Sequence, residues 1–194
     1  MPAADVGPVG GAPLLAHLGE PAHVSLHARR LPARAANVVA RRGLAAPRVT
    51  AVAHVDTKPG TPGALDNGTG VAALLRAAET LPEPRRVGVE LLGVNGEDYY
   101  AASGELRYLQ TADLDEVALA VNVDGVGLDP TAWSAYGCPP AVESRVRDSL
   151  RARGLVEGPA LFQIDHAVFA MRGRPAVALT SSDLQTALGS VAHS

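Results

Sequence analysis

Short apolar runs alternate with amphipathic segments along most of this chain. Runs rich in β-branched residues and bounded by Gly, Pro or Asn predict strands, whereas apolar residues recurring every three or four positions predict helices. We therefore expect strands over residues 22–30, 36–42, 48–53, 87–94, 117–123, 131–136 and 175–179. We expect helices over residues 67–81, 104–110 and 141–153.

The predicted helix over residues 67–81 has clear signals at both ends. Asn67 can accept a hydrogen bond from a free N–H group of the first turn, and Pro82 cannot continue the helix. The side chains expected on its buried face are Val71, Leu74, Leu75 and Ala78.

Strands and helices thus follow one another in a single series. The segment LAVNV at residues 119–123 is apolar enough for a strand that is buried on both faces. This pattern predicts an α/β protein, a three-layer α/β/α sandwich with a central mixed, mostly parallel sheet. Residues 1–13, rich in Gly, Ala and Pro, are expected to form a loose N-terminal leader, and residues 14–194 a single domain.

Composition excludes several classes of protein. Hydrophobic residues make up 47% of the chain and charged residues 19%, which is typical of a globular protein rather than a disordered one. The net charge of -3 provides no basic field for nucleic acid or an anionic membrane, so neither is expected as a partner. The single Cys138 excludes an internal disulfide. We see no signal peptide and expect a cytoplasmic location, with secretion left open if the N-terminus is incomplete; the oligomeric state is not predicted.

Acidic and histidine residues gather where predicted strands end. They are His54 and Asp56 after the strand over 48–53, Asp66 at the start of the first helix, Glu97 and Asp98 after 87–94, and Asp124 after 117–123. In α/β sheets, ligands bind beyond the carboxyl ends of the strands. Imidazole and carboxylate groups are the usual zinc ligands of catalytic sites. Crowded carboxylates also need a cation, because like charges raise each other's pKa. The pattern therefore predicts a metal site at this edge.

Five segments resemble, in order, the sequence blocks of one enzyme family. They are AHVDTKPGTPGALDNGTGVAALLRAAETL at 53–81, VELLGVNGEDYYAASGE at 89–105, VNVDGVG at 121–127, DHAVFAMRGRPAVAL at 165–179 and VAHS at 191–194. The family is that of the co-catalytic di-zinc aminopeptidases, which also includes glutaminyl cyclases and glutamate carboxypeptidases. Any one block is weak evidence, whereas the ordered set is specific.

The resemblance implies the zinc-dependent exopeptidase fold and a set of metal ligands. Two zinc ions per chain are expected, with one ion as the alternative. His54 and Asp124 would bind the first zinc, Asp98 and His193 the second, and Asp66 would bridge both.

Two further residues gain catalytic roles from the resemblance. Glu97 would be the general base, and Asp56 would hold the ring of His54 and fix its tautomer. The resemblance also implies a cis peptide bond between Asp66 and Asn67. His166 is either a residue of the substrate pocket or a structural histidine.

The implied activity is that of an aminopeptidase, which hydrolyses the N-terminal peptide bond of a peptide or small aminoacyl substrate. The alternatives are a glutaminyl cyclase-like enzyme with a single zinc and a non-catalytic binding module on the same fold. Two features depart from the family pattern. Glu97–Asp98 stands where the family has two glutamates, and the expected acidic residue and closing helix do not follow His193. We therefore expect a catalytic domain without its C-terminal helix.

Overall fold

The computed structural model of the protein describes residues 8–23, 25, 32–98, 102–161, 164–183 and 186. The chain divides into two compact units, Met1–Arg34 and Ala35–Ser194. The first contains helix α1 (Pro8–Leu15), and the second contains all the other helices and strands that are described.

The described residues of the second unit form a seven-stranded sheet of order β1-β3-β2-β4-β7-β5-β6. Strands β3, β2, β4 and β7 run parallel, β6 runs parallel to β5, and the pairs β1–β3 and β5–β7 are antiparallel. The strands are β1 (Val38–Arg42), β2 (Arg48–His54), β3 (Gly88–Val94), β4 (Val117–Val123), β5 (Thr131–Tyr136), β6 (Val156–Glu157) and β7 (Ala176–Ser181). This is the mixed, mostly parallel sheet expected from the sequence.

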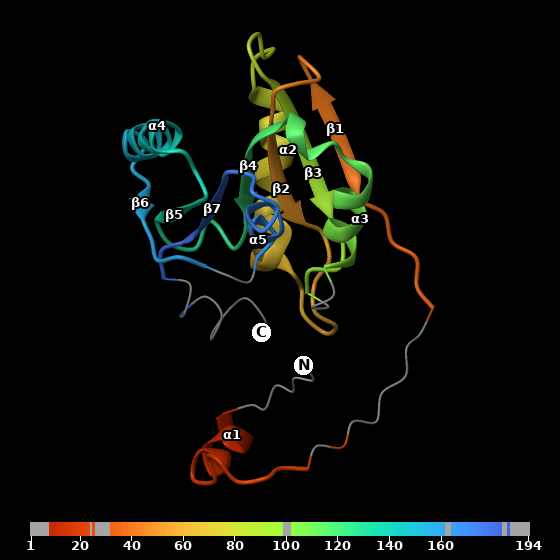
Figure 1. The fold of residues 1–194 in the computed structure, drawn as a ribbon, viewed down its shortest axis with the longest axis vertical. Coiled ribbons are helices and arrows are strands. Elements are labelled where there is room, and N and C mark those ends of the chain that lie inside the picture. Colours follow the sequence, from red (N-terminus) through yellow and green to blue (C-terminus); the bar gives the residue numbers. More distant parts are fainter. Residues whose placement is uncertain are drawn as a thin grey trace. The chain divides into compact units, whose positions relative to one another are not determined.

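Helices cover both faces of this sheet (Figure 1). They are α2 (Thr69–Thr80), α3 (Ser103–Thr111), α4 (Pro140–Arg151) and α5 (His166–Ala170). Tyr108 of α3 and Phe169 of α5 pack on one face, in a core with Val52 of β2 and Leu92 of β3. Helix α2 contacts the same central strands, β2, β3 and β4, from the other face. No described helix is long and apolar enough to cross a membrane.

Two local predictions at the N-terminus differ from the structure. Residues 8–15 form helix α1 where a loose leader was expected. Pro8 takes the first helical position, where its missing N–H group needs no partner. The predicted strand over 22–30 is not found at Ala22, His23 or Ser25, which lie in no helix or strand, and its other residues lie outside the described ones.

Helix α2 buries a narrower face than its apolar pattern indicated. Gly70 and Leu74 are its buried residues, whereas Leu75 is 63% exposed. A Cβ atom on Gly70 would lie 2.3 Å from the carbonyl oxygen of Val123, so the helix approaches β4 closely through a residue without a side chain. This close approach sets the rotation of the helix and turns Leu75 toward solvent.

A buried polar network joins α3 to the centre of the sheet. The Glu90 carboxylate is inaccessible to solvent and accepts hydrogen bonds from Tyr108, Thr50 and, at 2.5 Å, Arg41. Arg48 lies 3.6 Å from the same carboxylate. Burial opposes ionisation of Glu90, but the hydrogen bonds from Tyr108 and Arg41 and the charge of Arg48 lower its pKa overall.

We expect Glu90→Gln to destabilise the fold by about 3 kcal/mol, because it removes one of the two carboxylates, Glu90 and Glu116, that pair with the buried Arg48 guanidinium. Urea unfolding followed by circular dichroism measures this. The control is Glu83→Gln, which removes an exposed ion pair with Arg42 and should cost less than about 1 kcal/mol. Equal unfolding midpoints for the two variants would contradict the prediction.

Candidate metal centre

The predicted site residues that the structure describes lie at one edge of the sheet. His54 is the last residue of β2, Glu97 and Asp98 follow β3, and Asp124 follows β4. Because β3, β2 and β4 are parallel neighbours, their carboxyl ends meet at this edge. Asp66 reaches the same place from the turn η1 (Ala64–Gly68), which precedes α2.

His54, Asp66 and Asp124 bring their ligand atoms within 4.8 Å of one another. Nε2 of His54 lies 2.8 Å from Oδ1 of Asp66 and 3.6 Å from Oδ1 of Asp124. The ring is completely buried, yet neither contact has the geometry of a hydrogen bond from Nε2. The three atoms thus lie close enough together to bind one ion. One nitrogen with two carboxylate oxygens is a donor set that suits zinc.

The electrostatics of the group also favour a cation. Burial lowers the pKa of His54, but the carboxylates of Asp124 and Asp66 outweigh that effect and raise it to about 12. The carboxylates therefore create a strongly negative place around Nε2. A proton on the ring neutralises part of this negative charge in the metal-free protein, and a dication would neutralise more of it.

Asp66 is positioned by the residue that follows it. The Asp66–Asn67 peptide bond is cis, as the family resemblance implies. The Asn67 side chain accepts a hydrogen bond from the N–H group of Gly70 at 3.0 Å and donates one to the carbonyl of Val123 at 2.9 Å. Asn67 thus accepts a hydrogen bond from the first turn of α2, as predicted, although Gly68 is the residue that directly precedes the helix. It also ties the turn that holds Asp66 to the strand end that holds Asp124.

Glu97 is partly buried beside this group. Burial raises its pKa, His54 opposes the rise, and the nearby charges of Asp124, Asp98 and Asp66 add to it, which gives a value of about 7. A carboxylate with such a pKa is suited to exchange protons near neutral pH.

Asp98 is 6% exposed, but it does not belong to the group of mutually close ligand atoms. Its side chain is one methylene shorter than the glutamate that the family has at this position. His193, the other ligand expected for a second metal, lies outside the described residues. Of the five predicted metal ligands, the structure therefore brings His54, Asp66 and Asp124 together.

Asp56 makes contacts that differ from the predicted ones. Nδ1 of His54 donates to the backbone carbonyl of Asp56 at 3.0 Å, whereas the Asp56 carboxylate lies 3.8 Å from Nδ1. That carboxylate accepts hydrogen bonds from the N–H groups of Gly96 at 2.7 Å, Glu97 at 3.3 Å and Asp98 at 3.1 Å. The backbone of Asp56 thus fixes the tautomer of His54, leaving the Nε2 lone pair for a metal, and its side chain fixes the loop that holds Glu97.

We expect Asp56→Asn to lower turnover about 10–100-fold, the range found for residues that orient metal ligands. The amide group turns a donor toward the N–H groups of the loop and so releases Glu97, while the carbonyl that orients His54 remains. Steady-state kinetics alongside zinc titration measures this, with Asp129→Asn at an exposed position as the control. Zinc affinity reduced as much as turnover would show that Asp56 acts through His54 after all.

His166 has the contacts of a structural histidine. It is 1% exposed, its Nε2 donates to the carbonyl of Leu161 at 3.0 Å, and its ring packs against the tilted ring of Tyr136 with centroids 4.0 Å apart. Burial lowers its pKa to about 4, so the ring is neutral. Sequence reasoning missed Glu105, which lies buried near this segment, because a single acidic residue in an amphipathic helix gives no signal of burial.

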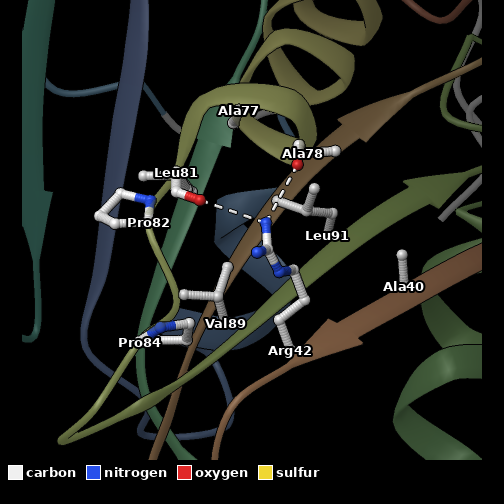
Figure 2. A pocket seen from close by; sticks show the side chains of 9 residues that line it. All are labelled: Ala40, Arg42, Ala77, Ala78, Leu81, Pro82, Pro84, Val89 and Leu91. Atoms are coloured by element: carbon white, nitrogen blue, oxygen red, sulfur yellow. Dashed lines mark hydrogen bonds between the residues drawn. The ribbon is translucent and has the colours of Figure 1, made fainter.

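Two pockets in the described part of the chain differ in their relation to the metal centre. Figure 2 shows an apolar one between the end of α2 and strands β1 and β3, where Arg42 donates to the carbonyls of Ala78 and Leu81. It lies at the amino ends of the parallel strands, away from the site. The other includes Trp133 and Ser181, and Ser181 bonds to the carbonyl of Gly125, next to Asp124.

Comparison with known proteins agrees with this geometry. The chain is 33% identical over 122 residues to the probable lipoprotein aminopeptidase LpqL of Mycobacterium tuberculosis, a match that covers 60% of this chain and 24% of that protein. The chain thus spans about a quarter of the length of this curated relative.

Solved structures share the fold. A zinc aminopeptidase from Bacillus subtilis, BSAP, superposes with a TM-score of 0.62 at 21% identity over 77% of this chain and 40% of its own. A glutaminyl cyclase from Porphyromonas gingivalis does so with a TM-score of 0.60 at 24% identity, over 76% of this chain and 64% of its own. The family model of peptidase family M28 matches residues 37–193, which include every predicted site residue. The chain therefore belongs to peptidase family M28.

Proposed function

We propose that this chain is the catalytic domain of a zinc-dependent aminopeptidase, which removes the N-terminal residue of peptides. The observation that supports this most directly is the group of His54, Asp66 and Asp124, with the partly buried carboxylate of Glu97 beside it. Membership of a peptidase family and the likeness to a probable aminopeptidase and to a zinc aminopeptidase support the same activity.

His54, Asp66 and Asp124 would hold one zinc ion, and Asp66, Asp98 and His193 are the residues available for a second. When bound, zinc lowers the pKa of a water molecule and polarises the scissile carbonyl group. Glu97 takes a proton from the attacking water and donates it to the departing amine. Asp56 keeps Glu97 in place by binding the backbone of its loop.

The charge of the site supports action at the N-terminus. Glu97, Asp66, Asp98 and Asp124 surround a single imidazole in the described part of the site. With one zinc ion bound, the four carboxylates would still exceed the charge of the ion, and the remaining negative charge would attract the positive α-amino group of an unblocked peptide. An N-acetylated peptide lacks that charge and would bind poorly.

The test uses the zinc-loaded chain with a set of dipeptides, their N-acetylated counterparts and peptides with an N-terminal glutamine. We expect release of the first residue from the unblocked peptides alone. Ring closure of the glutamine without hydrolysis would instead support a glutaminyl cyclase, the alternative favoured by the solved cyclase of the same fold. Zinc binding without either reaction would support a binding module. The cytoplasmic location and the absence of nucleic-acid and membrane partners stay predictions.

A further inference from the structure

Two buried acidic side chains that the proposed mechanism does not use lie close to each other, and one of them, Asp165, feels the charges of the metal ligands His54 and Asp124. Glu105 and Asp165 are each 2% exposed. None of their carboxylate oxygens has a hydrogen-bond partner in the described part of the chain. Buried carboxylates without a donor are costly, so this arrangement needs an explanation.

The closeness of the two carboxyl groups accounts for the missing hydrogen-bond donors. Burial raises the pKa of Asp165 well above its ordinary value, and a close contact with the Glu105 carboxyl group raises it further. An ionised carboxylate can only accept hydrogen bonds. As long as both groups are ionised, neither can therefore donate a hydrogen bond to the other. Like charges in a buried place cannot both persist, and one proton between the groups removes the repulsion and supplies the missing donor.

The position of Glu105 connects the pair to the loop of the proposed base. Glu105 lies in the first turn of α3. The preceding residue, Gly104, donates to the carbonyl of Asn95 at 2.8 Å, and a Cβ atom on it would lie 2.4 Å from that oxygen. Asn95 opens the loop that contains Glu97, so the start of α3 and this loop form one tightly packed unit.

The position of Asp165 connects the pair to the other side of the site. Asp165 directly precedes α5, which packs on β4 and β7. The charged groups that act on Asp165 are Glu105 of α3, His54 of β2 and Asp124 after β4. A bond between Glu105 and Asp165 therefore joins the loop of Glu97 to the part of the molecule that holds the metal ligands.

We propose that Glu105 and Asp165 share one proton and form a carboxyl–carboxylate bridge that positions the Glu97 loop against the metal ligands. Both are positioning residues and act through this loop. The bridge itself does not depend on the proposed function, whereas its consequence for catalysis rests on it.

Infrared spectroscopy of the metal-free chain tests the shared proton. A protonated carboxyl group has a C=O stretching band that carboxylates and amides lack. At pH 8 we expect this band in the wild type and its loss in both Glu105→Gln and Asp165→Asn, because in each variant the new amide donates the hydrogen bond and no proton is needed. Glu97, with a pKa of about 7, contributes only a weak band at pH 8. A band that persists at wild-type intensity in both variants would overturn the proposal, and the result does not depend on enzymatic activity.

Amide hydrogen exchange tests positioning. Glu105→Leu has a similar volume but no polar group, so it breaks the bridge, whereas Glu105→Gln preserves it. We expect the leucine variant to speed exchange at Gly96, Glu97 and Asp98 at least about tenfold relative to Val52 in β2, and the glutamine variant to match the wild type. A general loss of stability would speed all these amides together.

The kinetic consequence follows from the same variants. We expect Glu105→Leu to lower kcat about tenfold with little change in KM, and Glu105→Gln to restore it, because a small displacement of a catalytic group is costly. Should the leucine variant not fold, Asp165→Leu replaces it and breaks the bridge from the other side. Wild-type exchange at Gly96–Asp98 in a folded leucine variant would overturn the positioning role.

Discussion

Replacing Glu97 by glutamine should leave zinc binding near the wild-type level and lower turnover by about 10²–10⁴-fold, the contribution of a general acid–base group. Glutamine keeps the size of the side chain and the backbone contacts of Glu97 with Asp56. It cannot take a proton from the attacking water or return one to the departing amine. The loss should therefore appear in kcat, measured with an unblocked dipeptide, while zinc affinity from a competition titration is unchanged.

The matched control is Glu79→Gln, the same chemical change on the exposed side of α2, where Glu79 pairs with the exposed Arg76. It should retain full activity. Turnover of Glu97→Gln close to that of this control would exclude Glu97 as the base.

His54→Ala should weaken zinc binding by more than about 100-fold and abolish turnover with it. Even residues that merely orient a ligand alter metal affinity by about 10–100-fold, and His54 is the nitrogen donor of the ligand group. Its removal also leaves Asp66 and Asp124 facing each other without the imidazole that now lies between them.

Zinc affinity measured against a chromophoric chelator shows this effect, with His23→Ala, an exposed histidine of the first unit, as the control. Unchanged affinity in His54→Ala would remove this residue from the ligand set and with it the proposed centre. The two variants together separate metal binding from proton transfer. His54→Ala should lose both zinc binding and turnover, whereas Glu97→Gln should lose turnover alone.

Local sequence signals predicted most elements of the sheet. The strands over 117–123 and 131–136 have the predicted bounds, and β2 and β3 differ from prediction by one residue at one end. Such segments are short, apolar and bounded by turn residues, so their conformation depends on signals that lie within them. The short strand β6 and helix α5 were not predicted, because two and five residues are too few for a periodic pattern.

The candidate site was predictable because its residues follow strands. Once β2, β3 and β4 are parallel neighbours, His54, Glu97 and Asp124 must meet at one edge. Asp66 was a candidate from its place at the start of a predicted helix, but it follows a loop, so no strand end fixes its position. Its bridging role came from the resemblance to a known family. The contacts of Asp56 were not predictable, since its distance from the Gly96–Asp98 loop depends on how two separate strand ends pack.

The sequence by itself thus determined the α/β architecture, the edge of the sheet at which the chemistry takes place, and the residue types of a metal centre, because these depend on periodicity and on strand ends. Only the tertiary structure decided which ligands converge, how α2 rotates around Gly70, and that Glu105 lies buried against Asp165. These features depend on distances between segments far apart in the chain, and such distances are set by packing and by the solvation of buried charge rather than by any local pattern.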